Sequence, residues 1–137
     1  MRGRSSDSVK IKYALPEEKV EEIVLTYVDK LKLKIDILLA VLFGSYAKGN
    51  YSFGSDIDVL VVAENLPEDL SKRFSLLADN ELEYEIQPFG YTRKEFDKML
   101  EETHPLALEI LKTGKIIYLK PGYKVGKDQK RPRFEGK

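Results

Sequence analysis

Apolar residues recur along the chain with two different periods, and each change of period marks a new element. Val20, Val24 and Leu31 share one face of a helix, whose start is indicated by Pro16 and the two glutamates after it. The unbroken apolar run Ile37–Phe43 is typical of a strand that is buried on both faces. The remaining pattern predicts strands over residues 57–62, 81–91 and 116–119 and helices over residues 66–78, 92–100 and 105–111.

This alternation of helices and strands predicts an α/β (α+β) fold in which helices pack against a small mixed sheet. The 137 residues contain no internal repeat and no linker, and their number suits one domain. We expect that domain over residues 13–119. Residues 1–12 are expected to form a basic, flexible N-terminus. Residues 120–137 are expected to form a basic tail, disordered or docked on a partner, because apolar periodicity ends at Pro121.

The net charge of zero hides an uneven distribution of charge. Residues 1–12 carry four basic residues and one acidic residue, and residues 120–137 carry seven basic and two acidic residues. Such tails can bind an acidic partner, nucleic acid or the acidic body of the chain itself, and nucleic acid is not the favoured choice. No signal peptide and no membrane-length apolar run is present, so a cytoplasmic protein without a membrane partner is expected.

The absence of cysteine and the presence of a single histidine exclude several kinds of catalytic and metal site. The chain has no cysteine, which excludes disulfides and thiolate catalysis. Its one histidine, His104, precedes Pro105 at the start of a predicted helix, where a structural or surface role is expected. A zinc site and a Ser-His-Asp hydrolase are therefore not supported.

The segment from Gly44 to Asp58 contains the candidate phosphate-binding and metal-binding residues. A strand ends at Phe43, and Gly44 and Ser45 follow at a turn, where free backbone N–H groups can bind phosphate. Two acids, Asp56 and Asp58, come later with one residue between them. On a strand this spacing places both carboxylates on one face, roughly 6–7 Å apart along the chain, where they can share hard cations such as Mg²⁺.

Two other motifs fit this segment poorly. Gly44 and Gly49 have the spacing of a phosphate-binding P-loop, but Asn50 stands where that loop needs lysine. A calcium-binding EF-hand also begins with two acids at this spacing, but the apolar Leu60 follows where a ligand is required. An ordinary turn would explain Gly54 and Ser55 but not an acid between Ile57 and Val59.

The sequence Gly44-Ser45, ten further residues and then Asp56-x-Asp58 resembles the signature of the DNA polymerase β superfamily of nucleotidyltransferases. The small size resembles the minimal nucleotidyltransferase branch of that superfamily. The resemblance covers about residues 20–119 and implies a small mixed sheet with helices packed against it, the polymerase-β-like nucleotidyltransferase fold. It also implies that Gly44, Ser45 and Lys48 hold the phosphates of the nucleotide.

The family has a third carboxylate on a neighbouring strand, which here is the strand over residues 81–91. Glu83 and Glu85 share one face of that strand, so periodicity does not choose between them. The segment Glu85-Ile86-Gln87-Pro88 is similar to the family's usual arrangement, and we therefore prefer Glu85. By resemblance, Asp56, Asp58 and Glu85 are the catalytic and metal-binding residues, with two Mg²⁺ ions, or Mn²⁺ in their place.

The resemblance implies a nucleotidyltransferase that moves a nucleotide, most simply AMP from ATP, to a hydroxyl acceptor. Minimal members of the family are commonly antitoxins that adenylylate a tyrosine of a HEPN-type toxin, so a HEPN-type protein partner is expected. The chain shows no separate acceptor-binding domain, which agrees with specificity borrowed from a partner. The alternatives are an aminoglycoside-like small molecule or an RNA end as acceptor, or a non-catalytic antitoxin that only binds its partner.

Overall fold

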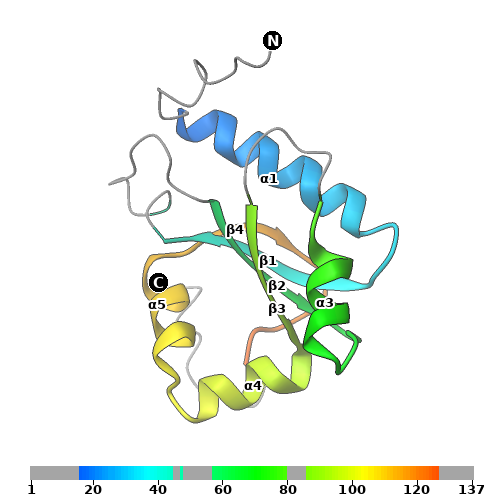
Figure 1. Cartoon of the computed structure of the whole chain (residues 1–137). Helices are drawn as coiled ribbons and strands as arrows, with labels where there is room; N and C mark the ends of the chain where they lie inside the picture. The colour runs from blue at the N-terminus through cyan, green and yellow to red at the C-terminus, as the bar shows by residue number, and fades with distance from the viewer. Residues whose placement is uncertain (1–15, 45–46, 48–56, 80–85, 127–137) are drawn as a thin grey trace.

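The computed structural model describes residues 16–44, 47, 57–79 and 86–126. Their helices and strands follow one another in the order that the apolar pattern predicts (Figure 1). In order they are α1 (Glu17–Leu31), β1 (Ile37–Phe43), β2 (Ile57–Ala63), α3 (Leu70–Leu77), β3 (Ile86–Thr92), α4 (Arg93–Glu101), α5 (Pro105–Thr113) and β4 (Lys115–Leu119). None of these helices is long and apolar enough to cross a membrane.

The four described strands form one mixed sheet in the order β3-β2-β1-β4. β1 pairs antiparallel with β2 and β4, whereas β2 and β3 are parallel and joined through α3. All seven residues of β1 are buried, as are all of β2 except Asp58, which is half-buried. The expected mixed sheet is confirmed, and its two most apolar strands lie at the centre because only there are both faces covered.

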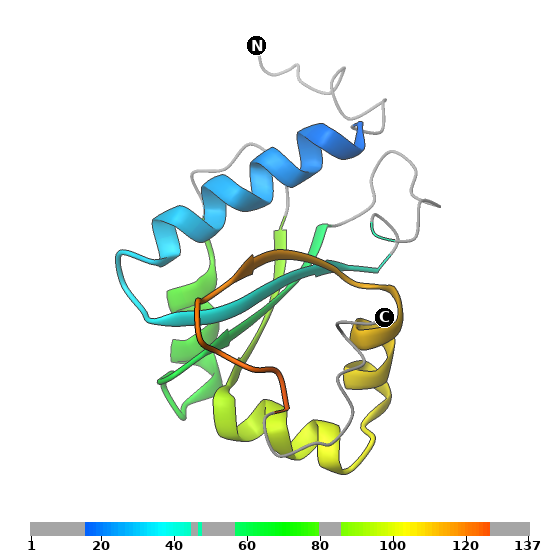
Figure 2. The same cartoon turned by 180° about the vertical axis from the view of Figure 1, so that it is seen from behind.

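Helices cover both faces of this sheet (Figures 1 and 2). α1 and α3 pack on one face, around Val24, Tyr27 and Leu77. α4 and α5 pack on the other face, around Phe96 and Ile110. The alternation of β1 and β2 side chains supplies both cores, because successive residues of a strand point to opposite faces.

The helix expected over residues 66–78 begins later than predicted. Asp69 caps α3 by accepting hydrogen bonds from the backbone N–H groups of Ser71 and Lys72, at 2.9 and 3.1 Å. Leu70 and Phe74, two of the apolar residues that recur at helical spacing in this segment, are 73% and 52% exposed. The buried face of α3 instead carries a charged residue, Arg73, and the apolar Leu77. Hydrophobic periodicity therefore finds this helix but places its start too early and does not reveal the burial of Arg73.

Hydrogen bonds with good geometry make the burial of Arg73 tolerable. Its guanidinium donates to the carbonyl oxygens of Pro67 (2.8 Å) and Gly90 (3.2 Å) and to both carboxylate oxygens of Glu95 (2.8 and 3.2 Å). Glu95 also completes the predicted capping box with Thr92 at the start of α4. One arginine thus joins the α3 entry, the end of β3 and the α4 entry, because a guanidinium offers five donors in a fixed plane.

The last described residues pack against the second core. Tyr123 and Val125 lie beside the cluster that contains Phe96 and Ile110, and Gly126 is buried. Residues 120–126, which apolar periodicity assigned to a tail, therefore belong in part to the packed body. An irregular segment has no repeating period, so its apolar contacts leave no signal in the sequence pattern.

Candidate active site

The sheet topology brings the predicted catalytic segments to one end of the molecule. Because β1 and β2 are antiparallel, Phe43 at the end of β1 pairs with Asp58 near the start of β2. Because β2 and β3 are parallel, Ile57 pairs with Ile86 at the start of β3. Ile57 is the residue between the two aspartates, and Ile86 is the residue after Glu85. The described strands thus bring Asp58, the end of β1 and the start of β3 to one end of the sheet.

Gly44 and Asp58 are in close contact at this end of the sheet. Gly44 has φ of +80°, a left-handed conformation that favours glycine. A Cβ atom built on Gly44 would overlap the Oδ2 atom of Asp58 and lie 3.2 Å from its Cγ. Glycine is therefore required here twice, once for the backbone angle and once for the space that the carboxylate occupies.

An aromatic pair borders this carboxylate on the same face of the sheet. Asp58, Leu60 and Val62 alternate with residues of the first core, so Asp58 shares the α4–α5 side with Phe43 and Phe89. The rings of Phe43 and Phe89 meet edge to face across β2, with centroids 5.2 Å apart. A half-buried carboxylate beside two rings loses part of its hydration, which strengthens its interaction with a cation.

α1 and α3 are tied together near the end of α1, away from the Gly44 end of the sheet. The hydroxyl of Tyr27, a buried residue, donates to the carbonyl oxygen of Leu77 at 2.6 Å, and Lys30 pairs with Asp79 at 2.9 Å. Burial, followed by the charge of Asp79, raises the pKa of Tyr27 well above its ordinary value. Both contacts fix the end of α3, from which the chain continues towards β3.

Two of the six predicted site residues, Gly44 and Asp58, lie in the described part of the chain. Ser45, Lys48, Asp56 and Glu85 lie outside the described residues, as does the alternative Glu83. The described residues contain no cluster of three or more metal-binding side chains. The oxygen donors that the motif offers are the kind that Mg²⁺ prefers, and the half-buried carboxylate of Asp58 against Gly44 fits such an ion.

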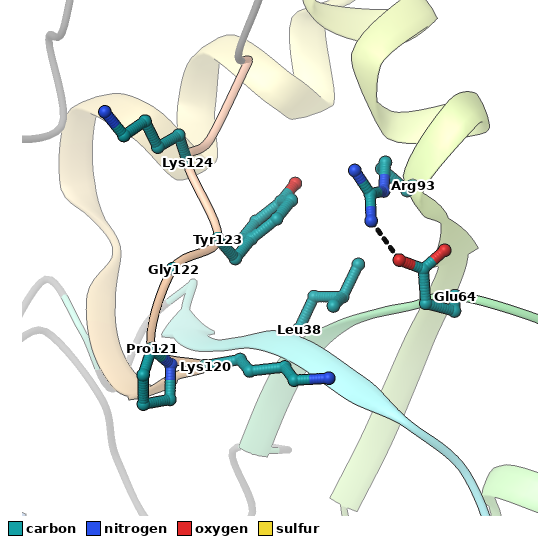
Figure 3. Close-up of a pocket in the computed structure, with 8 residues that line it drawn as sticks. All are labelled: Leu38, Glu64, Arg93, Lys120, Pro121, Gly122, Tyr123 and Lys124. Atoms are coloured by element: carbon teal, nitrogen blue, oxygen red, sulfur yellow. Dashed lines mark hydrogen bonds and ion pairs between the residues drawn. The ribbon is translucent and has the colours of Figure 1, made fainter.

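A cavity of about 420 Å³ lies at the opposite end of the sheet, about 20 Å from Asp58 by the length of a seven-residue strand. Figure 3 shows Arg93 and Tyr123 facing one another across it, with Glu64 paired to Arg93. The guanidinium lies 5.8 Å from the ring centroid. Burial and the charge of Asp97 raise the pKa of Tyr123 to about 12. Two of its three lining cations, Arg93 and Lys120, already have carboxylate partners, and its volume alone does not make it the catalytic site.

Comparisons with known proteins agree with this geometry. The family model described as "Polymerase beta, Nucleotidyltransferase" matches residues 18–121. A relative from Methanocaldococcus jannaschii named "Putative protein adenylyltransferase MJ1305" is 35% identical over 111 residues, which cover 76% of this chain and 75% of the relative. A second, "Putative protein adenylyltransferase MJ0141" of the same organism, is 31% identical over 84 residues, which cover 58% of this chain and 83% of the relative.

The fold is also found in a solved structure. The crystal structure of a protein described as a "putative nucleotidyltransferase" from Sulfolobus solfataricus is similar, with a TM-score of 0.58 and 15% identity. The similarity covers 89% of this chain and 96% of that one. At this identity the likeness shows the fold alone, and it confirms the polymerase-β-like architecture expected from the sequence.

The fold, the motif and the family match together define a class of enzyme, the nucleotidyltransferases. The chain belongs to the polymerase β nucleotidyltransferase family, whose model covers most of its length. Members of this family use a nucleoside triphosphate and, in general, divalent metal ions.

Proposed function

We propose that this protein transfers AMP from ATP to a tyrosine hydroxyl of a HEPN-type protein, and acts as the antitoxin of that protein. The observation that carries the proposal is the contact between Gly44 and the Asp58 carboxylate, at the end of the sheet where β1 ends and β2 and β3 begin. A protein acceptor is supported by the relative that is 35% identical and bears the name of a protein adenylyltransferase.

The roles of the site residues are those that the resemblance to the family implies. Asp56, Asp58 and Glu85 would hold two Mg²⁺ ions, and the backbone N–H groups of Gly44 and Ser45, with Lys48, would hold the outer phosphates of ATP. Bound at these carboxylates, the metal ions supply positive charge that stabilises the attacking and leaving oxygens. Asp58 stands on a central strand with buried neighbours, so its carboxylate is fixed before ATP arrives.

The chemical step is an in-line displacement. The tyrosine oxygen forms a bond to the α-phosphorus of ATP, and the bond between that phosphorus and the bridging oxygen of the β-phosphate breaks. Pyrophosphate leaves with the electron pair of that bond. The phenolic proton passes to a carboxylate, and Glu85 is the residue we assign to this role.

The test is to co-express the full chain with a HEPN-type partner and measure the partner's mass. We expect a mass increase in units of AMP, located by fragmentation on a tyrosine, which disappears with Asp58→Asn. Asp36→Asn is the matched control, because it makes the same chemical change on an exposed residue that pairs with Lys120 at the other end of the sheet. That variant should modify the partner as the wild type does.

Two other outcomes would redirect the proposal. An unmodified partner together with efficient labelling of an RNA end or an aminoglycoside would keep the enzyme class and replace the acceptor. Equal inhibition of the partner by wild-type protein and Asp58→Asn, without any added mass, would indicate an antitoxin that acts by binding alone.

A further inference from the structure

The two outer strands of the sheet differ in how well they are protected against pairing with another strand. β3 carries Pro88 at its middle, and proline has no N–H group for a continuous ladder. β4 has a described neighbour only on its β1 side, and it has no proline. Its side chains Ile116 and Leu119 are 42% and 43% exposed. An exposed apolar edge of this kind is a site where another strand can add.

α1 extends this apolar edge on one face of the sheet. Lys115 at the start of β4 pairs with Glu17 and Glu21 of α1, and Lys32 lies 4.3 Å from the ring centroid of Tyr118. α1 therefore runs in the same direction as β4. Leu25 follows Glu21 by one helical turn, so it lies on the same side of the helix, and it is 44% exposed.

Charge is distributed along α1 with opposite net sign at its two ends. The first two turns carry four glutamates and one lysine, and the end of the helix and the turn after it carry three lysines and one aspartate, of which Lys30 pairs with Asp79 beside α3; these residues are Glu17, Glu18, Lys19, Glu21, Glu22, Asp29, Lys30, Lys32 and Lys34. Glu18 and Lys34 are exposed, and neither has an ion-pair partner among the described residues. A surface that is acidic at one end and basic at the other is complementary to its own copy turned through 180°.

We propose that this surface, made of β4 and the Leu25 side of α1, binds a second copy of the same chain. The two β4 strands pair antiparallel about a two-fold axis near Ile117 and join the two sheets into one. The two α1 helices then lie antiparallel on the same face, so Leu25 meets its equivalent. The glutamates at the start of each helix face the lysines at the end of the other.

The irregular register of β4 limits how much of the dimer interface this strand can form and how much is left to α1. The pairing of β1 with β4 shifts by one residue between Ala40 and Val41, where Ile117 has no partner. A bulge of this kind increases the twist of the strand and shortens the stretch that can pair outward. The helix contact through Leu25 is therefore a necessary part of the interface, and single substitutions there should be effective.

The dimer leaves both catalytic ends accessible. Leu42 of β1 pairs with Lys115 of β4, so the Gly44 end of the sheet lies at the start of β4. An antiparallel arrangement of the two β4 strands places the two starts at opposite ends of the joined sheet. Each site could then receive its own acceptor protein.

Sedimentation velocity of the full chain over a range of concentrations tests the proposal. We expect a dimer for the wild type and monomers for Leu25→Glu and Ile116→Lys. Leu70→Glu is the matched control, because Leu70 is 73% exposed on α3 beside the other half of the sheet, and this variant should remain a dimer. A monomeric wild type, or equal dissociation of all three variants, would overturn the inference.

A charge exchange supplies a second test that does not depend on apolar substitutions. Glu18→Lys and Lys34→Glu should each weaken the dimer, and the double variant should restore it, because each subunit would then again face the opposite charge. Both positions are exposed, so folding, followed by circular dichroism, should be unchanged. Two single variants that associate as tightly as the wild type would show that α1 does not face its copy.

Discussion

The carboxylate of Asp58 occupies the space that a side chain on Gly44 would need. The two residues are 14 positions apart in the sequence; Gly44 directly follows β1, and Asp58 lies on the adjacent antiparallel strand β2. The glycine that ends one strand thus creates the place for the acid on the next. This contact gives the glycine of the motif a role in positioning the acid, in addition to the phosphate binding that its backbone can provide.

A comparison of Gly44→Ala with Gly122→Ala should separate the cost of backbone strain from the effect of displacing the Asp58 carboxylate. Both glycines have a left-handed conformation, with φ of +80° and +88°, so each alanine should cost about 1–2 kcal/mol of unfolding free energy. A Cβ on Gly122 has no atom within 4 Å, whereas one on Gly44 displaces the carboxylate. Only Gly44→Ala should abolish nucleotide transfer. Wild-type transfer by a folded Gly44→Ala protein would show that the Asp58 position is not critical.

The choice between the two glutamates before β3 can be made by substitution. Glu85→Gln should reduce transfer by at least about a hundredfold, the scale of a lost catalytic acid–base group. Glu83→Gln should have a mild effect. Initial rates with labelled ATP measure both. The opposite order would assign the third carboxylate to Glu83, and mild effects from both would contradict the assignment of a third carboxylate to this segment.

Loss of the hydroxyl group should change the unfolding free energy differently at two tyrosines, Tyr27 and Tyr123. Tyr27 donates to Leu77 at 2.6 Å in a buried site, so Tyr27→Phe should cost about 1–2 kcal/mol. The hydroxyl of Tyr123 is buried with no hydrogen-bond partner among the described residues, so Tyr123→Phe should be neutral or stabilising by up to about 1 kcal/mol. Urea unfolding measures both values. A destabilised Tyr123→Phe protein would reveal a partner for that hydroxyl.

The pairing of Arg73 with Glu95 should make stability depend on pH in the acid range. Burial raises the pKa of Glu95, but hydrogen bonds from Arg73 and from Thr92 lower it, and the net direction is downward. The unfolded chain therefore takes up this proton at higher pH than the folded protein. The stabilisation is complete above the ordinary glutamate pKa and is lost as pH falls through the lower folded value.

Arg73→Met should remove this dependence together with about 2 kcal/mol of stability at neutral pH, because two backbone carbonyls also lose a charged donor. Unfolding free energies measured between pH 3 and pH 7 should show a shallower slope for the variant. Lys98→Met is a suitable control, because Lys98 is exposed and its ion pair with Glu102 is long, at 3.8 Å. An unchanged slope for Arg73→Met would assign the acid sensitivity to other carboxylates.

The sequence predicts the architecture well wherever one period dominates. The seven apolar residues of β1 are typical of a strand covered on both faces, and the capping box at Thr92 and Glu95 marks the start of α4. The motif also identifies the end of the sheet at which Gly44 and Asp58 meet. These features can be predicted because the signals for them are local: propensity, capping and spacing depend on residues close together in the chain.

Features that depend on distant partners were missed. The burial of Arg73 depends on Glu95, 22 residues later, so the apolar pattern gave no sign that this charged residue packs against the sheet. Tyr123 packs in an irregular segment, where no period exists to detect. The third carboxylate is not settled for another reason. Residues 83 and 85 share a face of any strand, so alternation does not distinguish them.

The central position of β1 and β2 has a consequence for motion. Both strands have a hydrogen-bonded neighbour on each side and helices over both faces, so their amide protons should exchange with solvent only when the whole domain unfolds. The amides of β3 and β4, at the edges, can open locally at lower cost. Asp58 thus belongs to the most slowly opening unit of the protein. A ligand that tightens this site should therefore slow exchange throughout the domain and not only beside the nucleotide.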